Sequence, residues 1–489
     1  MAPGRDRILF VSHSEHGQTT VMLSAIHELL LRNEFDIHFA SHTPALPRLK
    51  NLLERNRDKY DAGVDVPFHT INGLSMIELL ERDGLVDSLP HSPGLWAVIQ
   101  SLEMVGRMVF RQTGEEYMHC FDSCVRILED VKPALVVVDP ICAYGIDACL
   151  YTNIPHMILS PLPFTMTVSM LQPWGAHFWK YPAMATAYRY PLPWYLIPAN
   201  IAASLLLIYI AIASPGMKDI GRVRSQRGLK GMYPGFETYR KDRLHLMPAH
   251  PAIDYDFTIP DNVVGCGPIV LPTVPVSSVD PGLAQWLDRR PTILVNLGTH
   301  ALIDDAGAKE MAIGLKSVLE QRPDLQVLWK LKTQREIHSP LEVLREQIAD
   351  DRVKIVDWLD VEPISILQHE NTICYVHHGG ANAFFEACKS GVTHVVLPQW
   401  FDTYEMASKA EYLGVGVYAS QSTAPRVNAN ELISGFRVAL APECVAKARQ
   451  IAEIVNRTEG RVVACEKITE VVRSLRSKNG KAAVNGVSS

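Results

Sequence analysis

The sequence predicts an α/β protein built of two doubly wound, Rossmann-like domains that face each other across a cleft. The chain has 489 residues, well past the length at which a single hydrophobic core stops growing. Short apolar segments, typical of buried parallel strands, alternate with amphipathic helical segments in the first third, and the alternation restarts after a proline-rich stretch at residues 272–282. Two such halves place a ligand at the carboxyl ends of their strands, in the cleft.

The first domain is expected to span residues 1–271. Its expected elements follow the strand and helix periodicities, and they are RILFVS (7–12, strand), TTVMLSAIHELLLR (19–32, helix), and the strands FDIHFAS (35–41), ALVVVDP (134–140), HMILSP (156–161) and NVVGCGPIVLP (262–272). The alternation weakens between residues 165 and 235, where the chain becomes aromatic-rich and apolar. This domain therefore has less regular loops than the second one.

A linker is expected at residues 272–290 and a second domain at residues 291–475, followed by a flexible tail at 476–489. The last helix is expected to be free to pack back on the first domain. The elements of the second domain are PTILVNLGT (291–299, strand and turn), AKEMAIGLKSVLEQR (308–322, helix), and the strands LQVLWKLK (325–332), VKIVDWL (353–359), TICYVHH (372–378) and THVVLPQ (393–399).

Composition excludes several classes of function. The chain is 47% apolar and 20% charged, as a globular protein is, and its net charge of −6 gives no basic excess for nucleic acid. Nine scattered cysteines without a CxxC pair favour a reducing, cytoplasmic setting over a disulfide framework or a zinc site. The short apolar run at residues 8–11 predicts a first strand rather than a signal peptide.

One apolar segment, residues 196–216, carries no charge over about one bilayer thickness of helix. A buried helix or the wall of an apolar pocket is the first interpretation. Contact with an intracellular membrane, as a surface or re-entrant helix of a peripheral protein, is the alternative. Pro198, Asn200 and Ser204 argue against a helix that spans the bilayer.

The segment YVHHGGANAFFE, residues 375–386, joins a buried strand to a helix through a glycine turn. Free backbone N–H groups and the positive end of a helix dipole at such a turn favour a phosphate. His378 and Asn382 can donate to phosphate oxygens, and Glu386 can accept from sugar hydroxyls. A zinc site is disfavoured, because His377 and His378 leave the strand on opposite faces.

Residues 358–404 resemble the nucleotide-sugar signature of family 1 UDP-glycosyltransferases, which have the glycosyltransferase B (GT-B) fold. The resemblance implies a donor site with the following parts: Trp358 at the uracil, with Leu359 beside it in the site, His378 and Gly380 at the phosphates, Asn382 and Ala383 in support, Glu386 at the ribose, and Asp402 with Thr403 at the sugar. Gly298 and Thr299, in NLGTH, resemble the loop under the diphosphate. Ala383 replaces a serine or threonine, so its backbone N–H alone can serve, and Thr403 replaces a glutamine, which leaves the sugar open.

Inverting transfer needs a base for the acceptor hydroxyl. The resemblance implies a histidine in the loop after the first strand, oriented by an aspartate from a later strand, and no metal. Asp139 falls at that aspartate, although a turn or capping role is its alternative. Gln18 stands at the histidine position, so His16, in the same loop, is predicted to be the base, with His13 in reserve.

The predicted function is inverting, metal-independent transfer of a sugar, with glucose from UDP-glucose as the first choice, to a hydroxyl of a hydrophobic small molecule such as a phenol, polyketide or sterol. The UDP-sugar is a donor substrate, and no cofactor is expected. A UDP-sugar-binding protein without catalysis and a UDP-sugar epimerase of the same fold are the alternatives.

Overall fold

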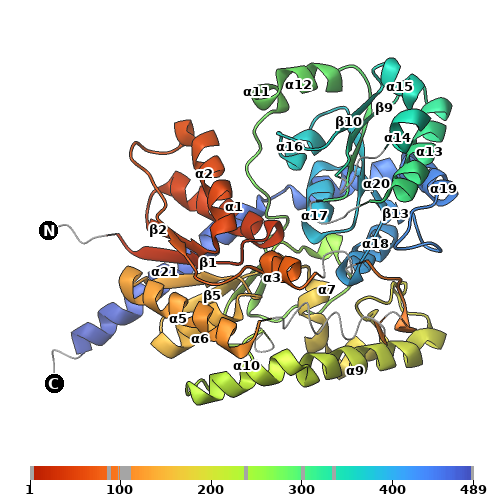
Figure 1. Cartoon of the computed structure of the whole chain (residues 1–489). Helices are drawn as coiled ribbons and strands as arrows, with labels where there is room; N and C mark the ends of the chain where they lie inside the picture. Colours follow the sequence, from red (N-terminus) through yellow and green to blue (C-terminus); the bar gives the residue numbers. More distant parts are fainter. Residues whose placement is uncertain are drawn as a thin grey trace.

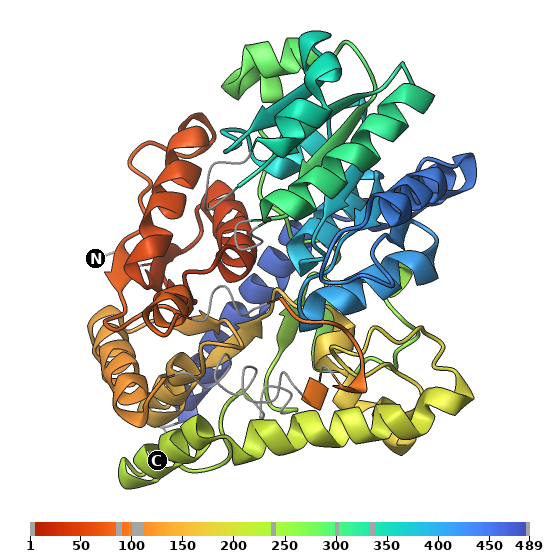
Figure 2. The same ribbon diagram turned by 45° about the vertical axis from the view of Figure 1, so that its right-hand side comes forward.

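The computed structural model of the chain describes residues 5–84, 90–96, 98–99, 112–235, 241–298, 303–332 and 338–485. Two parallel sheets, each with helices on both faces, form two domains that lie side by side (Figure 1). The predicted fold class is therefore confirmed. Figure 2 shows the first domain and the second domain meeting along the carboxyl ends of their strands.

The sheet of the first domain has seven parallel strands within the described residues, in the order β3-β2-β1-β4-β5-β6-β7. These strands are β1 (Arg7–Val11), β2 (Asp36–Ser41), β3 (Phe68–Thr70), β4 (Leu135–Val138), β5 (His156–Leu159), β6 (His245–Met247) and β7 (Val263–Gly265). The sequence analysis missed β3 and β6, because a strand of three residues carries too little periodicity to be recognised.

Helices cover both faces of this sheet. One core contains residues of α1 (His16–Arg32) and α2 (Leu46–Arg55), and the core on the other face contains residues of α5 (Gly114–Val131) and α6 (Ala143–Thr152). The other helices of the domain are short or lie at its edge: α3 (Met76–Arg82), α7 (Phe164–Thr167), α8 (Ala176–Trp179), α9 (Ile197–Ala213) and α10 (Pro215–Gln226).

The sheet of the second domain, over its described part, has six parallel strands in the order β10-β9-β8-β11-β12-β13. These are β8 (Thr292–Asn296), β9 (Gln326–Lys330), β10 (Val353–Val356), β11 (Thr372–His377), β12 (Thr393–Val396) and β13 (Gly416–Tyr418). Its helices include α13 (Asp305–Gln321), α14 (Ser339–Val343), α15 (Arg345–Ala349), α16 (Pro363–Leu367), α17 (Ala381–Ser390), α18 (Phe401–Leu413), α19 (Ala429–Ala439) and α20 (Pro442–Val455).

The strand register determines which loops meet. In the first sheet Val11 pairs with Val138, so the residues after β1 and β4 emerge side by side. In the second sheet Val295 pairs with Val376, so the loop after β8 lies beside the turn after β11. Each place is the point where the strand order reverses, and a doubly wound sheet binds its ligand there.

The predicted linker and tail are more structured than expected. Residues 272–290 contain α11 (Val276–Val279) and α12 (Pro281–Leu287), and the buried Trp286 packs in the core of the second domain. The last helix, α21 (Gly460–Asn485), crosses back to the first domain and joins the core beneath α1 (Figure 1). It continues through residue 485 of the predicted tail, because a helix that is anchored by packing extends residue by residue without a new nucleation step.

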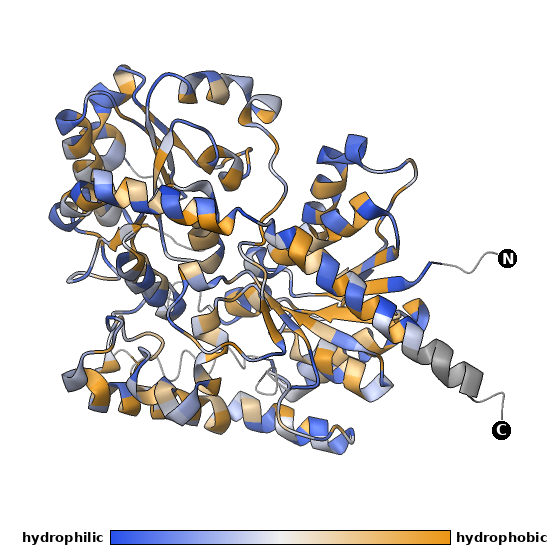
Figure 3. Ribbon diagram, turned by 180° about the vertical axis from the view of Figure 1, so that it is seen from behind, coloured by the Kyte–Doolittle hydropathy of each residue, from blue (hydrophilic) through white to orange (hydrophobic). Residues whose placement is uncertain are grey.

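The apolar segment forms α9, and the expectation of a buried helix is wrong. The other part of the first interpretation, the wall of an apolar pocket, stays a prediction. Residues 194–213 are long and apolar enough to cross a membrane, yet only 22% of the most apolar window is buried. Figures 1 and 2 show α9 and α10 running one after the other along one side of the molecule. In Figure 3 the hydrophobic colour dominates α9 and the hydrophilic colour α10.

Candidate active site

The turn after β11 depends on two adjacent glycines. Gly379 has a φ of +88°, and a Cβ there would lie 2.6 Å from the backbone oxygen of Thr403. A Cβ on Gly380 would lie 2.6 Å from Nε2 of His378. Any other residue at either position must therefore displace a neighbour. The chain turns sharply enough to aim the start of α17 at the cleft.

The start of α17 has the properties of an anion site. Gly380 is its N-cap, and no side chain of the described residues caps the helix there. The first backbone N–H groups and the positive end of the helix dipole are thus left for a ligand. Ala383 lies in this first turn with its side chain buried, so its backbone N–H is the group it can offer, as the sequence predicts.

The two histidines of the turn have different surroundings. His377 is buried: its Nδ1 accepts from the N–H of Gly379 at 3.1 Å, and its Nε2 lies 3.0 Å from Nδ1 of His394. Burial lowers the pKa of His377 well below its usual value. His378 is half-buried, packs against the Cα of Gly298, and has its ring 5.3 Å from that of Trp400. The two rings thus lie on different sides of the strand, an arrangement that does not fit one shared zinc ion.

Glu386 lies one helical turn further along α17 and is half-buried. Its pKa is raised to about 8, mainly by burial and also by the neighbouring Glu362, while the guanidinium of Arg48 acts in the opposite direction. Arg48 belongs to α2 of the first domain and donates to the carbonyl of His16 and the hydroxyl of Thr20, both at 3.1 Å. Sequence reasoning missed Arg48, because nothing in its local pattern points across the cleft.

Trp358 follows β10 and exposes half of its surface, so one of its faces is accessible to a planar base. The ammonium of Lys330, at the end of β9, lies 4.3 Å from the centre of its ring. This contact holds the indole from the protein side by a cation–π interaction. Leu359 points instead into the core beside it. Lys330 is a second residue that the sequence analysis missed.

Asp402 and Thr403 lie in the first turn of α18, which begins at Phe401. The carboxyl of Asp402 is half-buried, and burial raises its pKa to about 6. The side chain of Thr403 is fully buried, and its hydroxyl accepts from the N–H groups of Gln399 and Trp400, both at 3.1 Å. The structure thus gives Thr403 a capping role, and its predicted contact with the sugar has no support from this geometry. Thr299 lies outside the described residues.

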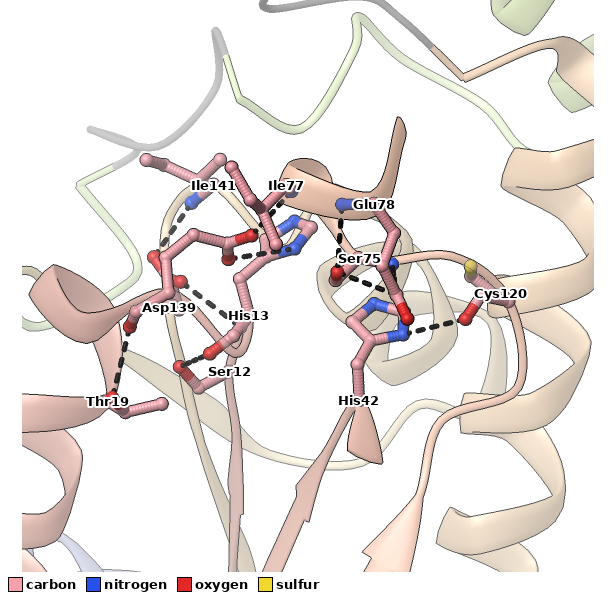
Figure 4. Close-up of polar contacts among 12 residues, drawn as sticks. Ser12, His13, Thr19, His42, Ser75, Ile77, Glu78, Cys120, Asp139 and Ile141 are labelled. Carbon is pink, nitrogen blue, oxygen red and sulfur yellow. Dashed lines mark hydrogen bonds and ion pairs between the residues drawn. The ribbon is translucent and has the colours of Figure 1, made fainter. Parts of the chain in front are cut away.

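The loop after β1 in the first domain is a cluster of buried polar side chains (Figure 4). The carboxylate of Asp139 accepts from the backbone N–H groups of His13, at 3.4 Å, and Ile141, at 3.1 Å. Glu15 accepts from the N–H of Ile77 at 3.1 Å and lies 3.8 Å from Nδ1 of His13. Burial raises the pKa of Asp139 to about 7 and lowers that of His13 to about 4.

Two further side chains complete this cluster. The ring of His42 stacks on that of His13, with 5.7 Å between centroids, and its Nε2 lies 2.8 Å from the hydroxyl of Tyr144. Burial lowers the pKa of His42 to about 4. No local pattern in the sequence indicates His42 or Tyr144, because only the register of β1 with its neighbours brings them together.

His16, the predicted base, is the first residue of α1 and its side chain is exposed. The next residue, Gly17, accepts a hydrogen bond from the side-chain amide of Asn382 at 3.4 Å. This contact joins the two domains between the helix start of α1 and that of α17. The structure places Asp139 against His13, and the pairing of Asp139 with His16 stays a prediction.

An anion-binding turn in one domain, opposite imidazoles and carboxylates in the other, is what transfer from a nucleotide-sugar requires. The class of protein that this fold and site define is therefore a GT-B glycosyltransferase. A family model described as UDP-glucoronosyl and UDP-glucosyl transferase matches residues 238–431.

Similar proteins and structures agree with that class. The glycosyltransferase sdnJ of Sordaria araneosa is 34% identical over 500 aligned residues, which cover 95% of this chain and 98% of that protein. A UDP-glycosyltransferase of Talaromyces amestolkiae is 24% identical over 51% of this chain and 50% of its own length. A solved UDP-glucosyltransferase of Polygonum tinctorium has the same fold, with a TM-score of 0.64, 16% identity, and coverage of 97% of this chain and 100% of that one. The chain belongs to the UDP-glycosyltransferase family.

Proposed function

We propose that the chain transfers a hexose, with glucose from UDP-glucose as the first candidate, to a hydroxyl of an apolar small molecule. Inversion at the anomeric carbon and independence of a metal ion are parts of the proposal, with His16 as the base. The observation that carries it is the contact between Asn382 and Gly17, because it sets the phosphate-binding turn beside the loop that bears His16.

Support for His16 over His13 comes from access. A base must reach the acceptor hydroxyl directly. His16 is exposed, whereas His13 is buried and has a pKa lowered to about 4. Support for metal independence comes from the start of α17, whose N–H groups and dipole stabilise negative charge on a departing diphosphate without a cation.

Support for an apolar acceptor comes from the first domain near the sugar end of the donor site. The N–H of His91 donates to the carbonyl of Gln399 at 2.9 Å, and the hydroxyl of Tyr404 donates to the carbonyl of His91. The loop that carries His91 packs through Leu95 and Val98 against α9. An apolar layer therefore lies behind a segment that contacts Gln399 and Tyr404, the neighbours of the predicted sugar-binding Asp402. The nine free, buried cysteines support the proposal of a reducing, intracellular setting.

The test is incubation with UDP-glucose, UDP-galactose or UDP-xylose and a panel of phenols, polyketides and sterols, with products followed by mass. A gain of one sugar, a β-linked product by NMR and full activity in a chelator are expected. Binding of UDP by calorimetry with no product on the whole panel would identify the non-catalytic alternative. Conversion of the UDP-sugar to its epimer without an acceptor would identify the epimerase.

A further inference from the structure

One face of α9 is an exposed apolar stripe. It begins with an aromatic pair just before the helix and continues with four side chains at helical spacing. The six members are Trp194, Tyr195, Ile201, Leu205, Tyr209 and Ile212. We call this stripe the α9 face. The helix carries no charged residue from Ile197 to Ala213. Six large apolar side chains exposed in one row are unusual on the surface of a soluble monomer, and such a row marks a site of interaction.

The opposite side of α9 is fixed to the first domain. The side chain of Asn200 is buried; it accepts from the N–H of Ala183 at 2.7 Å and donates to the carbonyls of Phe178 and Tyr181, both at 3.0 Å. Ala203 packs beside it in the same small core. A helix tied to its own domain along one side cannot leave it to cross a bilayer. The α9 face can meet a membrane only as a helix that lies in its plane.

Basic residues follow the α9 face directly. Residues 215–230 contain five basic residues and one acidic residue in a chain whose net charge is −6. Three of the basic residues are paired with aspartates, Arg222 with Asp219, Arg224 with Asp147 and Arg227 with Asp122. Lys218 and Lys230 are exposed and are the charges that a surface can meet. Exposed aromatic rings, an aliphatic middle and an adjacent basic segment are together the pattern of a helix at the surface of an anionic membrane.

We propose that the α9 face binds this protein to the surface of an anionic lipid bilayer, with α9 lying in the interface and the basic segment at the headgroups. Charge complementarity selects lipid over a second copy of the chain, because Lys218 and Lys230 match anionic headgroups, whereas the α9 face of a second copy carries no acidic group for them. One consequence rests on the proposed function: apolar acceptors dissolved in the same bilayer would lie close to the loop that carries His91.

The experiment is flotation of the full chain with phosphatidylcholine vesicles, prepared with and without phosphatidylserine. Strong binding to the vesicles that contain phosphatidylserine is expected, weakened and not abolished by salt. The variant Leu205→Glu/Ile212→Glu is expected to lower the partition constant about a hundredfold, about tenfold for each side chain withdrawn from the apolar layer. Lys218→Glu/Lys230→Glu is expected to cost at least about fivefold per residue on the anionic vesicles alone.

The matched control is Leu341→Glu/Val438→Glu in the second domain, because these side chains are 48% and 50% exposed, close to the 54% and 59% of Leu205 and Ile212. The control is expected to bind as the parent does, and circular dichroism and UDP binding verify that every variant is folded. Failure of the parent to bind either kind of vesicle overturns the proposal, as does equal binding by the Leu205/Ile212 variant. A dimer that this variant dissociates, without vesicle binding, identifies a second copy instead. Vesicle binding needs no sugar transfer, so a failure of the proposed function is recognised separately.

Discussion

The two helix starts that meet in the cleft, at α1 and at α17, are built differently. Each follows a buried parallel strand at the point where its sheet reverses strand order. The turn before α17 consists of glycines pressed against neighbours, and a Cβ at Gly380 would meet His378 at 2.6 Å. The start of α1 is open: a Cβ at Gly17 meets nothing within 4 Å. Its rigidity comes instead from buried imidazoles and carboxylates behind it.

The difference separates two tasks. Binding a diphosphate requires fixed N–H groups, which a glycine turn supplies through backbone geometry alone. Moving a proton requires side chains whose pKa values are set by burial and by one another, such as Asp139 at about 7 and His13 at about 4. The first task leaves a strong local pattern in a sequence, and the second depends on residues that the fold brings together.

The largest effect is expected at the open start of α1. His16→Ala removes the proposed base, and kcat is expected to fall about 10²- to 10⁴-fold with UDP binding unchanged. Initial rates with saturating UDP-sugar and calorimetry with UDP measure the two quantities. His13→Ala, matched in size and chemistry, tests the buried imidazole of the same loop.

A His16→Ala enzyme with the parent's kcat would rule out His16 as the base. If His13→Ala alone then lost activity while it bound UDP and unfolded at the parent's temperature, the base would be His13. Asp139→Asn separates the cases further, because its carboxylate accepts from the backbone N–H of His13. If it changes the lower limb of the pH profile in the parent and not in the His13→Ala variant, the carboxylate acts through His13.

The glycine turn gives the next largest effect. Gly380→Ala drives a methyl group against the ring of His378, whereas Gly17→Ala adds one to open space. We expect Gly380→Ala to weaken UDP binding by about tenfold to a hundredfold, since a displaced imidazole loses a hydrogen bond to a charged phosphate. Gly17→Ala is expected to bind UDP as the parent does. Calorimetry decides, and equal losses in both variants would contradict the contrast between the two turns.

The contrast between a local glycine turn and a cluster assembled by the fold explains which parts of the site can be predicted from the sequence. The alternation of strands and helices and the glycine turn are local patterns, and strand periodicity with turn chemistry predicted them. The roles of the residues from Trp358 to Asp402 come from the family resemblance and stay predictions. His42 and Arg48 became site neighbours only through the register of β1 and the packing of α2 against the cleft. Thr403 shows the converse limit: the family resemblance implies a sugar contact, and the local geometry of α18 turns its hydroxyl toward the N–H of Gln399.

The prediction that the α9 segment is a buried helix was wrong for a different reason. A stretch that is apolar all round predicts burial by composition, and the sequence does not say how much partner surface its own domain provides. Asn200 shows which side is covered, because its amide bonds to three backbone groups of the segment before α9. Only the placement of that segment shows that the other side is left exposed.

Glu386 gives an effect that depends on pH. Its pKa is raised to about 8 from an ordinary 4.5, so the folded chain holds this proton more tightly than the unfolded chain does. The contribution of this bound proton to the free energy of unfolding is complete below pH 4.5 and is lost as the pH rises toward about 8. Glu386→Gln removes this dependence. The melting temperature of the variant minus that of the parent is therefore expected to rise with pH. In free energy of unfolding, the corresponding difference grows by at most about 1.4 kcal/mol per pH unit.

The control for this measurement is Glu342→Gln, a change in the acidic first turn of α14 on the surface of the same domain. The difference for Glu386→Gln is expected to rise more steeply with pH than the difference for this control. Equal slopes for the two variants would mean that burial does not raise the pKa of Glu386. The amide introduced by Glu386→Gln can still contact ribose hydroxyls, so UDP binding is expected to weaken and to persist.

The smallest effect is expected at the uracil end. Lys330→Met keeps the aliphatic length beneath the indole and removes the charge 4.3 Å from the ring centre. A cation–π contact of this kind contributes about 0.5–1 kcal/mol, so the affinity for UDP is expected to fall about two- to fivefold through a less ordered Trp358. Trp358→Ala removes the stacking surface itself, and Lys330→Met in that background is expected to have no further effect on UDP affinity. If the two losses added in the double variant, Lys330 would act on the nucleotide directly rather than through the indole.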